Sequence, residues 1–304
     1  MGYRAIREYR RLSIAALLAL AVAIGAIAPA PAQAWGFYAH RKTAEIAEAN
    51  VSPEVRAKVA KLLRSQKLLG TPDCALDTIE DASVWPDCVR RDYWRWGYTA
   101  AWHYRTAPIC EAFNARANCS GGNCVTAQVE RAHRVLADES LPDNVRLEAL
   151  AFMVHFAGDV HMPLHSGDKD DRGGNDREAD YGIVPGLNLH WIWDGPLAER
   201  AISDPADPVV RRYSPAERAE LTGGTPADWG KESWQISRSF VYPTAFDTDD
   251  ACAGELPMKT ALTQDDIARG VPIAKRRVQQ AGLRIADLLE GAFAPGPLPE
   301  PERS

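Results

Sequence analysis

The sequence predicts an all-α protein that forms a single compact multi-helix domain. Apolar residues recur at helical spacing along most of the chain, whereas runs with period-two alternation are almost absent. No change in composition marks a boundary between domains, and no repeat of solenoid or propeller length is visible. A chain of 304 residues with 46% apolar residues can bury a full core, which excludes disordered and collagen-like proteins.

Residues 1–34 are predicted to be a secretory signal peptide that is cleaved off and forms no part of the fold. Four arginines precede an apolar run at 14–28, and Ala32-Gln33-Ala34 has the A-x-A pattern of a cleavage site. The apolar run is too short for a membrane span. Cleavage leaves 304 − 34 = 270 residues with 35 − 4 = 31 basic and 41 − 1 = 40 acidic side chains, a net charge of −9. We therefore expect a secreted or periplasmic protein without a membrane span.

The charge balance and the cysteines exclude two further classes. An acidic chain argues against a protein that holds nucleic acid by a broad basic surface. Six cysteines in an exported chain indicate disulfides rather than a thiolate metal site. Cys119 and Cys124 bracket a Gly-Gly loop that is short enough to be closed by a local bridge, but six cysteines permit many connectivities.

Helix positions follow from capping residues and apolar periodicity. Ser52 is an N-cap residue, and Pro53 after it suits the first helical position of a helix that continues to Leu63. The most apolar helix opens at 141–143, and a Pro-rich polar tail at 295–304 is expected to be flexible. Further helices are predicted at about 75–90, 126–139, 141–161, 188–200 and 265–289.

Histidines that are paired with carboxylates carry the strongest chemical signal. His155 and Asp159 are four residues apart, as are His190 and Asp194, so each pair lies on one helix face. His165 follows the first pair closely. Imidazole nitrogens and carboxylate oxygens form a zinc-type ligand set, and these groups would be unfavourable in apolar helices without partners. The spacing alone leaves a metal site and ordinary hydrogen-bonded pairs as alternatives.

The expected cleavage site places Trp35 at the new N-terminus. A free α-amine together with its own carbonyl can chelate a metal ion, and His40 would supply a third donor from five residues further on. The alternative is a tryptophan that packs in the core after the signal peptide is removed.

These features resemble the S1/P1 nuclease family of zinc-dependent single-strand nucleases, which shares its architecture with bacterial zinc phospholipase C. The family's mature chain begins with Trp and has a His five residues later, as at Trp35 and His40. Matching motifs run in order as far as Asp194. They are Trp85-Pro-Asp87-Cys-Val-Arg90, Trp102-His103-Tyr104, the His-x-x-x-Asp-x-x-x-Pro-Leu-His motif from His155 to His165, Gly173-Gly174-Asn175, and Asn188-Leu189-His190 followed by Trp193-Asp194.

The resemblance implies a nuclease domain over residues 35–294 with three zinc ions in one cleft, a phospholipase C/P1 nuclease-like architecture. Asp159 would bridge two of the ions. The implied ligands are Asp87, His103, His155 and Asp159 for the first ion, the amine and carbonyl of Trp35 with His40 and Asp159 for the second, and His165, His190 and Asp194 for the third. His133 is then expected at the surface, and His161 is expected to support the site or the fold.

The implied activity is endonucleolytic hydrolysis of single-stranded DNA and RNA to 5′-phosphate products, with 3′-nucleotidase action on mononucleotides as a further expectation. A metal-activated hydroxide would attack phosphorus. Asp87, Asp159 and Arg90 are the expected catalytic residues, and Arg90 would brace phosphate oxygens. Tyr104, by stacking on a base, and Asn175 are expected to bind substrate. The alternatives are an ordinary exposed role for Arg90 and core packing for Tyr104.

Two positions depart from the family pattern. Thr106 stands where well-known members have an acid that contacts the base, and Met162 replaces a frequent Gln. Base preference is therefore not predicted, and the protein is expected to be a monomer. By analogy with the family, Cys110 pairs with Cys252, which leaves Cys74 for Cys88.

Two other functions are open as alternatives. A zinc phospholipase C shares the N-terminal Trp and the His/Asp spacing, but its last ligand is usually Glu and its first His lies further from the Trp. Asp194 and His40 therefore favour the nuclease. The other alternative is a secreted helical binding protein with structural zinc. Structural zinc sites are usually rich in cysteine, and an amine ligand is unusual in them.

Overall fold

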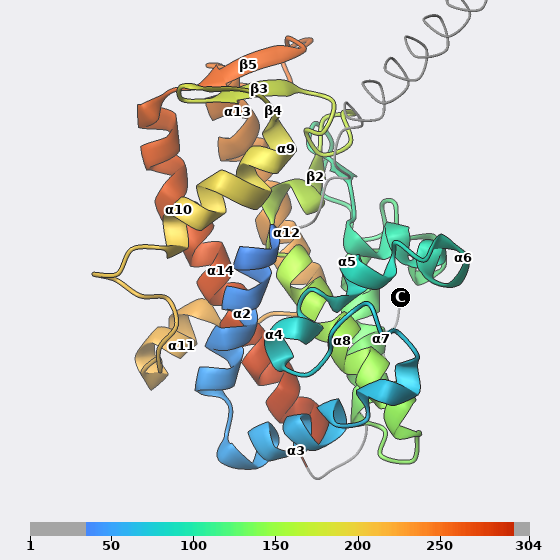
Figure 1. The fold of residues 1–304 in the computed structure, drawn as a ribbon. Coiled ribbons are helices and arrows are strands. Elements are labelled where there is room, and N and C mark those ends of the chain that lie inside the picture. Colours follow the sequence, from blue (N-terminus) through green and yellow to red (C-terminus); the bar gives the residue numbers. More distant parts are fainter. Residues whose placement is uncertain (1–34, 295–304) are drawn as a thin grey trace, which may run out of the picture. The chain divides into compact units, whose positions relative to one another are not determined.

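The computed structural model describes residues 35–294; the predicted signal peptide and the Pro-rich tail lie outside the described residues. The described part belongs to one compact unit. At its centre lie α8 (Asp143–Asp159) and α14 (Gln264–Phe293), with α7 (Val125–Ala137) packed on α8 and α2 (Phe37–Asn50) packed on α14 (Figure 1). The other α-helices are α3 (Pro53–Leu63), α4 (Ile79–Ala82), α5 (Trp85–Val89), α6 (Tyr93–Trp96), α9 (Leu189–Ile192), α10 (Ala198–Ile202), α11 (Pro215–Leu221), α12 (Pro226–Ile236) and α13 (Tyr242–Ala245).

Most of the predicted helices are present, and their capping chemistry explains where they begin. The side chain of Ser52 accepts a hydrogen bond from the Val55 amide at the start of α3, as the sequence predicts. Thr263 and Asp266 form a reciprocal capping box at the start of α14. The helices predicted at 126–139, 141–161 and 265–289 are α7, α8 and α14, with ends shifted by a few residues.

Two of the predicted helices are interrupted in the structure, and one helix of the structure was not predicted. The continuous helix predicted at 75–90 is wrong, because Thr78 caps a short α4 and a separate helix, α5, begins at Trp85 with Pro86 in its first turn. Pro86 has no amide hydrogen with which to continue a preceding helix. The helix predicted at 188–200 contains a π-helical turn, η5 (Trp193–Leu197), which accommodates Pro196. Helix α2 was not predicted, since its apolar positions are mostly alanines.

Two small sheets lie within the helical fold, although the sequence predicted none. Strands β3 (Glu178–Tyr181), β4 (Val184–Asn188) and β5 (Lys259–Leu262) form a sheet in the order β4-β3-β5, with β4 antiparallel and β5 parallel to β3 (Figure 1). Strands β1 (Ala107–Pro108) and β2 (Gly167–Asp168) pair in parallel. Each strand is too short to show a period-two pattern, and the helical class still describes the fold.

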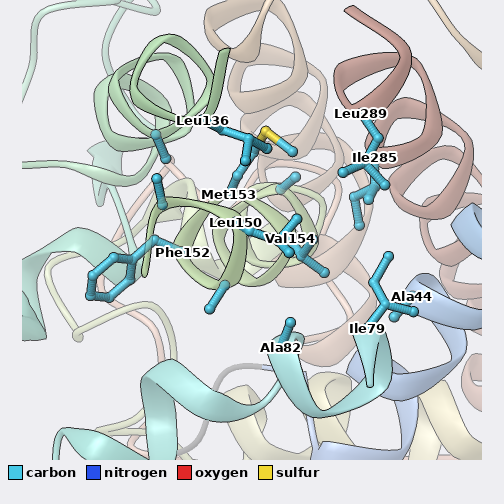
Figure 2. Close-up of a cluster of buried hydrophobic side chains, with 14 of the residues drawn as sticks. Ala44, Ile79, Ala82, Leu136, Leu150, Phe152, Met153, Val154, Ile285 and Leu289 are labelled. Carbon is cyan, nitrogen blue, oxygen red and sulfur yellow. The ribbon is translucent and has the colours of Figure 1, made fainter. Parts of the chain in front are cut away.

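Helix α8 passes through the apolar interior, and its end divides two core clusters. Every residue from Ala149 to Asp159 is buried, so this helix is enclosed on all sides. Figure 2 shows Leu150, Phe152 and Val154 of α8 among the side chains of neighbouring helices. A second cluster includes Trp35, Leu164, Leu189 and Trp193. The C-terminal end of α8 therefore lies where the two clusters meet, and there the buried side chains become polar.

Three disulfides close loops around this fold. Cys119 bonds to Cys124 within the short Gly-Gly loop, as the sequence predicts. The two pairings expected by analogy, Cys110–Cys252 and Cys74–Cys88, are also present. The described residues contain no free cysteine.

We expect the substitution Gly282→Ala to destabilise the crossing of α14 over α2. A Cβ atom at position 282 would lie 2.5 Å from Cβ of Ile46 and 2.9 Å from the carbonyl oxygen of Thr43. Relief of such contacts requires the two helices to separate, at about 1–3 kcal/mol of unfolding free energy. Urea denaturation measures this loss, and Gly291→Ala on the same helix is the control. At Gly291 the nearest atoms are those of the His133 side chain, at 3.3 Å. Equal stability of the two variants would contradict the close packing.

Candidate metal centre

Asp159, the last residue of α8, is a buried carboxylate that meets three imidazoles. Its Oδ2 lies 3.2 Å from Nε2 of His155 and 3.1 Å from Nδ1 of His103, and its Oδ1 lies 3.2 Å from Nε2 of His40. His155 is on α8, His40 is on α2, and His103 ends the 3₁₀ helix η2 (Gly97–His103). Three separate segments therefore converge on one carboxylate.

Asp87 extends this cluster from α5. Its Oδ1 lies 3.7 Å from Nδ1 of His103 and 4.0 Å from Nε2 of His155. Arg90, at the C-terminal end of α5, places Nη2 3.0 Å from the same oxygen, and its side chain is 23% exposed. The guanidinium is therefore tied to the cluster and still reaches solvent, which rules out an unattached surface arginine. The Cys74–Cys88 bridge adjoins Asp87 and anchors α5.

A second cluster brings together His165, His190 and Asp194. His165 ends the short 3₁₀ turn η4 (Pro163–His165), and the other two lie four residues apart across α9 and η5. Asp194 Oδ2 is 3.0 Å from Nε2 of His190 and 3.8 Å from Nε2 of His165, and the two rings stack with centroids 5.0 Å apart. Nδ1 of His165 lies 3.7 Å from Oδ1 of Asp159, so the two clusters are neighbours.

Backbone carbonyls orient three of these rings. Nδ1 of His155 lies 2.6 Å from the Ser83 oxygen, and Nδ1 of His190 lies 2.8 Å from the Gly173 oxygen. Nδ1 of His165 is likewise 2.8 Å from the carbonyl oxygen of His103. An Nδ1–H that donates to a carbonyl turns each ring so that Nε2 faces the carboxylates, and Nε2 is the nitrogen that can bind a metal ion once it has lost its proton.

The turn at Gly173 requires glycine. Its φ is +62°, and a Cβ atom there would lie 2.3 Å from the carbonyl oxygen of Leu164. This turn positions the carbonyl that holds His190, so the Gly-Gly-Asn motif acts through the backbone. Its third residue, Asn175, is partly buried, and its Nδ2 donates to the Arg172 oxygen at 2.9 Å.

Many polar atoms in these clusters lack hydrogen-bond partners, which fits a metal centre. Buried polar atoms without partners are rare in folded proteins because desolvation is unfavourable. Here the lone pairs of carboxylates and imidazoles converge, and this mixture of nitrogen and oxygen donors suits zinc. The buried atoms that make no hydrogen bond of good geometry are both oxygens of Asp87 and of Asp194, Oδ1 of Asp159, both ring nitrogens of His40, and Nε2 of His103. Some of them still lie within ion-pair distance of a neighbour, as Oδ1 of Asp87 does with Arg90.

Three donor groups can be drawn among the described residues, each with its ligand atoms within 4.8 Å of one another. One unites the second cluster, and the other two share His155 and divide the first cluster between them. The groups are His165, His190 and Asp194; His103, His155 and Asp159; and His40, Asp87 and His155.

The electrostatics of the clusters favour the ionised forms of Asp159 and Asp194. Burial alone would raise the pKa of Asp159, but the charge of His155 and hydrogen bonds from the imidazoles hold that pKa well below its usual value. Asp194 is shifted in the same direction, chiefly by His190. Burial would lower the pKa of His165, but Asp194 raises it to about 8, whereas burial lowers the pKa of His103 to about 4.

Trp35 is anchored beside both clusters. Its buried indole Nε1 donates to the Gly158 oxygen at 2.8 Å, next to Asp159. The following amide, of Gly36, donates to the carbonyl oxygen of Asp194 at 2.7 Å. The side chain packs in the core, and the main chain before α2 is held between two candidate ligands. Its function as an amine ligand stays a prediction.

The remaining candidate residues occupy varied positions. The ring of Tyr104 follows His103 and is 43% exposed, so core packing is excluded for it. His161 is fully buried, with Nε2 2.9 Å from Nη1 of Arg284. The surface position expected for His133 is wrong, because this ring is half-buried against α14.

A buried charge network behind α8 was missed by the sequence reasoning. Nε of Arg277 donates to the His161 oxygen at 3.0 Å, and Glu232 of α12 pairs with Arg277 and Arg284 at 2.6 and 2.7 Å. The network holds the chain just after Asp159 against α14. The available signal was two arginines within the long C-terminal helix, but periodicity does not reveal which arginines are buried.

Known proteins with similar sequences are nucleases. The sequence model of the family described as S1/P1 Nuclease matches residues 35–294. Endonuclease 4 of Arabidopsis thaliana is 28% identical over 86% of this chain and 90% of its own length. Nuclease S1 of Aspergillus oryzae is 25% identical over 84% of this chain and 91% of its own. A solved structure, alpha toxin from Clostridium absonum, matches with a TM-score of 0.48 and 10% identity, over 88% of this chain and 66% of that chain.

We expect His165 to make the stability of the chelator-treated protein depend on pH. Folding raises the pKa of this group from 6.5 to about 8, so the protonated form stabilises the fold at low pH. This contribution is complete below pH 6.5 and is lost as the pH rises through about 8, a change of about 2 kcal/mol. Urea denaturation at about pH 6 and about pH 9 compares the native chain with His165→Gln. The variant should lose less stability between the two pH values, and an equal loss in both would contradict the expectation.

Proposed function

We infer that this chain, which belongs to the S1/P1 nuclease family, is an endonuclease that hydrolyses phosphodiester bonds in single-stranded DNA and RNA. The observation that carries this proposal is the convergence of three groups of imidazole and carboxylate donors, many of them buried without hydrogen-bond partners. The products would be 5′-phosphates, and mononucleotides with a 3′-phosphate would be further substrates.

Three zinc ions would occupy this centre. The proposed ligands follow the family motifs residue by residue, and the distances among their side chains support them. The first ion would be held by Asp87, His103, His155 and Asp159, the second by the amine and carbonyl of Trp35 with His40 and Asp159, and the third by His165, His190 and Asp194. The central position of Asp159 between His40 and His155 supports a bridging function.

The centre suits hydrolysis of a phosphodiester. When bound, zinc lowers the pKa of water to roughly 7 and neutralises charge on phosphate oxygens. Asp87 and Asp159 would hold the metal ions at the reaction site, and Arg90 would donate hydrogen bonds to the non-bridging oxygens. The pairing of Arg90 with Asp87, together with its partial exposure, supports that function, because the guanidinium is oriented and remains accessible.

Base stacking would explain a preference for unpaired strands. Tyr104 follows His103 in the chain and is exposed, so an unstacked base could stack on its ring. In a duplex the faces of the bases are already covered. Asn175 would contact substrate from the turn at Gly173, although its Nδ2 is engaged by the Arg172 oxygen in this structure.

The alternative functions are less well supported. A zinc phospholipase C is not favoured, because the relatives that cover most of the chain are named nucleases and the last ligand position is Asp194 rather than Glu. A binding protein with structural zinc does not account for Arg90 and Tyr104, which face solvent beside the donors.

We further propose that the protein acts outside the cytoplasm, as a monomer, after removal of residues 1–34. Three disulfides support an oxidising compartment. Within residues 35–294, no helix has the length and apolar character needed to cross a membrane.

The central test is release of acid-soluble nucleotides from single-stranded DNA and RNA by the protein that begins at Trp35. We expect release that a chelator abolishes and zinc restores, with 5′-phosphate ends and three zinc ions per chain by elemental analysis. Asp159→Asn should lose zinc and activity, because this carboxylate is the proposed bridge.

Phospholipid hydrolysis by the same preparation is the control for the alternative activity. A zinc-loaded protein that cleaves phosphatidylcholine but not single strands would contradict the nuclease assignment. A zinc-loaded protein without either activity would support a structural function for the metal.

Extension of the chain before Trp35 should inactivate the enzyme. If the α-amine is a ligand, a peptide bond at that position removes a donor, and we expect the uncleaved protein to be nearly inactive. The matched control is an extension that ends in a protease site directly before Trp35, with activity measured before and after cleavage. Full activity of the uncleaved form would show that the amine is not required.

A further inference from the structure

The chain between Asp87 and His103 forms a loop that begins and ends at the cluster around Asp159. Asp87 on α5 and His103 at the end of η2 lie 3.7 Å apart, so the residues between them form a closed loop with both ends at the cluster. We call residues 91–98 of this loop the aromatic arm. Its helix α6 projects from the edge of the molecule beyond α5 (Figure 1).

The aromatic arm exposes three large rings. Trp94 is 96% exposed, Tyr93 is 75% exposed and Tyr98 is 59% exposed. Trp96, within the same helix, is by contrast buried and packs edge-to-face against Trp85, with centroids 5.1 Å apart. The arm is therefore fastened to the core by one aromatic ring while it presents three others to solvent. Exposed large rings gathered within eight residues are typical of a binding surface.

Other contacts hold α6 and two of the three exposed rings, Tyr93 and Tyr98, in place. Nη2 of Arg95 donates to the Leu69 oxygen at 2.7 Å, which ties α6 to the preceding loop. The Tyr93 ring packs on Gly97, where a Cβ atom would lie 2.6 Å from it. The Tyr98 ring meets Trp102 edge-to-face, with centroids 5.2 Å apart. Rings that are already ordered lose little conformational entropy when a ligand stacks on them.

The charges of the arm match a polyanion. Arg91 and Arg95 lie within it, Arg90 directly precedes it, and Asp92 is its one acidic residue. Arg90 is also paired with Asp87 and Arg95 also donates to the Leu69 oxygen, so Arg91 is the arginine that we expect to pair with phosphate. This local excess of positive charge stands out in a chain whose formal net charge is −6. Planar rings among guanidinium groups are the combination that binds an unpaired nucleic acid strand, because bases stack on the rings and phosphates pair with the arginines.

The arm is also joined through the chain to the proposed metal centre. Tyr98 contacts Trp102, the next residue is His103 of the ligand cluster, and exposed Tyr104 follows it. Aromatic side chains therefore run through the chain from the arm to the metal centre.

We propose that the aromatic arm is a stacking platform for the part of a single strand that lies beyond the nucleotides at the metal centre. This inference rests on the proposed nuclease function. It assigns the arm to binding of long strands and not to the chemical step. Long unpaired strands then bind more tightly than dinucleotides, with little dependence on base sequence.

The test compares KM for an oligothymidylate of about 20 nucleotides with KM for a dinucleotide, using the zinc-loaded enzyme. For Tyr93→Ala/Trp94→Ala, KM for the long strand should rise by about 5- to 150-fold for each lost stacking contact. KM and kcat for the dinucleotide should stay unchanged. Trp94→Ala alone serves as a second variant, because its side chain is almost fully exposed and its loss leaves the fold intact.

Matched variants separate stacking from other effects. Trp94→Phe should keep most of the affinity, because it retains a ring. Ile183→Ala removes an equally exposed apolar side chain from the turn between β3 and β4 and should change nothing. Arg91→Ala should reduce the slope of log KM against log salt for the long strand by about 0.7, the value for one phosphate contact on a single strand.

The possible outcomes distinguish a failure of the arm proposal from a failure of the proposed nuclease function. If the native enzyme cleaves neither substrate, the nuclease assignment fails and the arm proposal fails with it. If the native enzyme cleaves both substrates and the arm variants keep the native KM for the long strand, the arm proposal alone is wrong. Binding of phosphatidylserine vesicles that depends on Trp94, with KM unchanged, would overturn it in favour of a membrane surface.

Discussion

The burial of the Asp159 carboxylate is the constraint on which the rest of the structure depends. An isolated carboxylate in an apolar interior is strongly unfavourable, and it is stable here because imidazoles approach it on several sides. Those imidazoles come from α2, η2 and α8, so these segments must pack in one arrangement. Glycine permits the closest approach, because a Cβ atom on Gly158 would lie 2.8 Å from Nδ1 of His40. The same packing that buries the carboxylate therefore assembles the donors.

The two core clusters explain how one site combines ligands from distant parts of the chain. The cluster around α8 fixes His155 and Asp159, whereas the cluster around Trp35 and Leu189 fixes the segments that carry His165 and His190. Backbone carbonyls complete the arrangement, since each holds Nδ1 of one of three rings whose Nε2 faces a carboxylate. The main chain thus sets the orientation of these rings. Side-chain substitutions elsewhere would change that orientation only if they altered the packing of the main chain.

The sequence revealed what is local and missed what is distant. The His/Asp pairs four residues apart were visible because one helical segment carries both partners, and capping residues located the start of α3 for the same reason. The approach of Asp87 to His103 has no local signature, and it was anticipated only through the resemblance to a family. The break between α4 and α5 was missed because the apolar pattern continues across it. The burial of Arg277 and of His133 depends on which helix packs beside each residue, and periodicity within one helix does not encode that.

An acidic protein that cleaves a polyanion must gather positive charge locally. The chain carries 35 basic and 41 acidic side chains, so its surface as a whole would repel a nucleic acid. Attraction must then be local, and we assign it to the proposed metal centre, to Arg90 and to the arginines of the aromatic arm. Salt screens such interactions, whereas stacking on Tyr104 and Trp94 does not depend on charge. A strand held mainly by its bases must have those bases unpaired. If the aromatic arm binds the strand as we propose, rings rather than a broad basic face retain the substrate, and a preference for single strands is then compatible with an acidic surface.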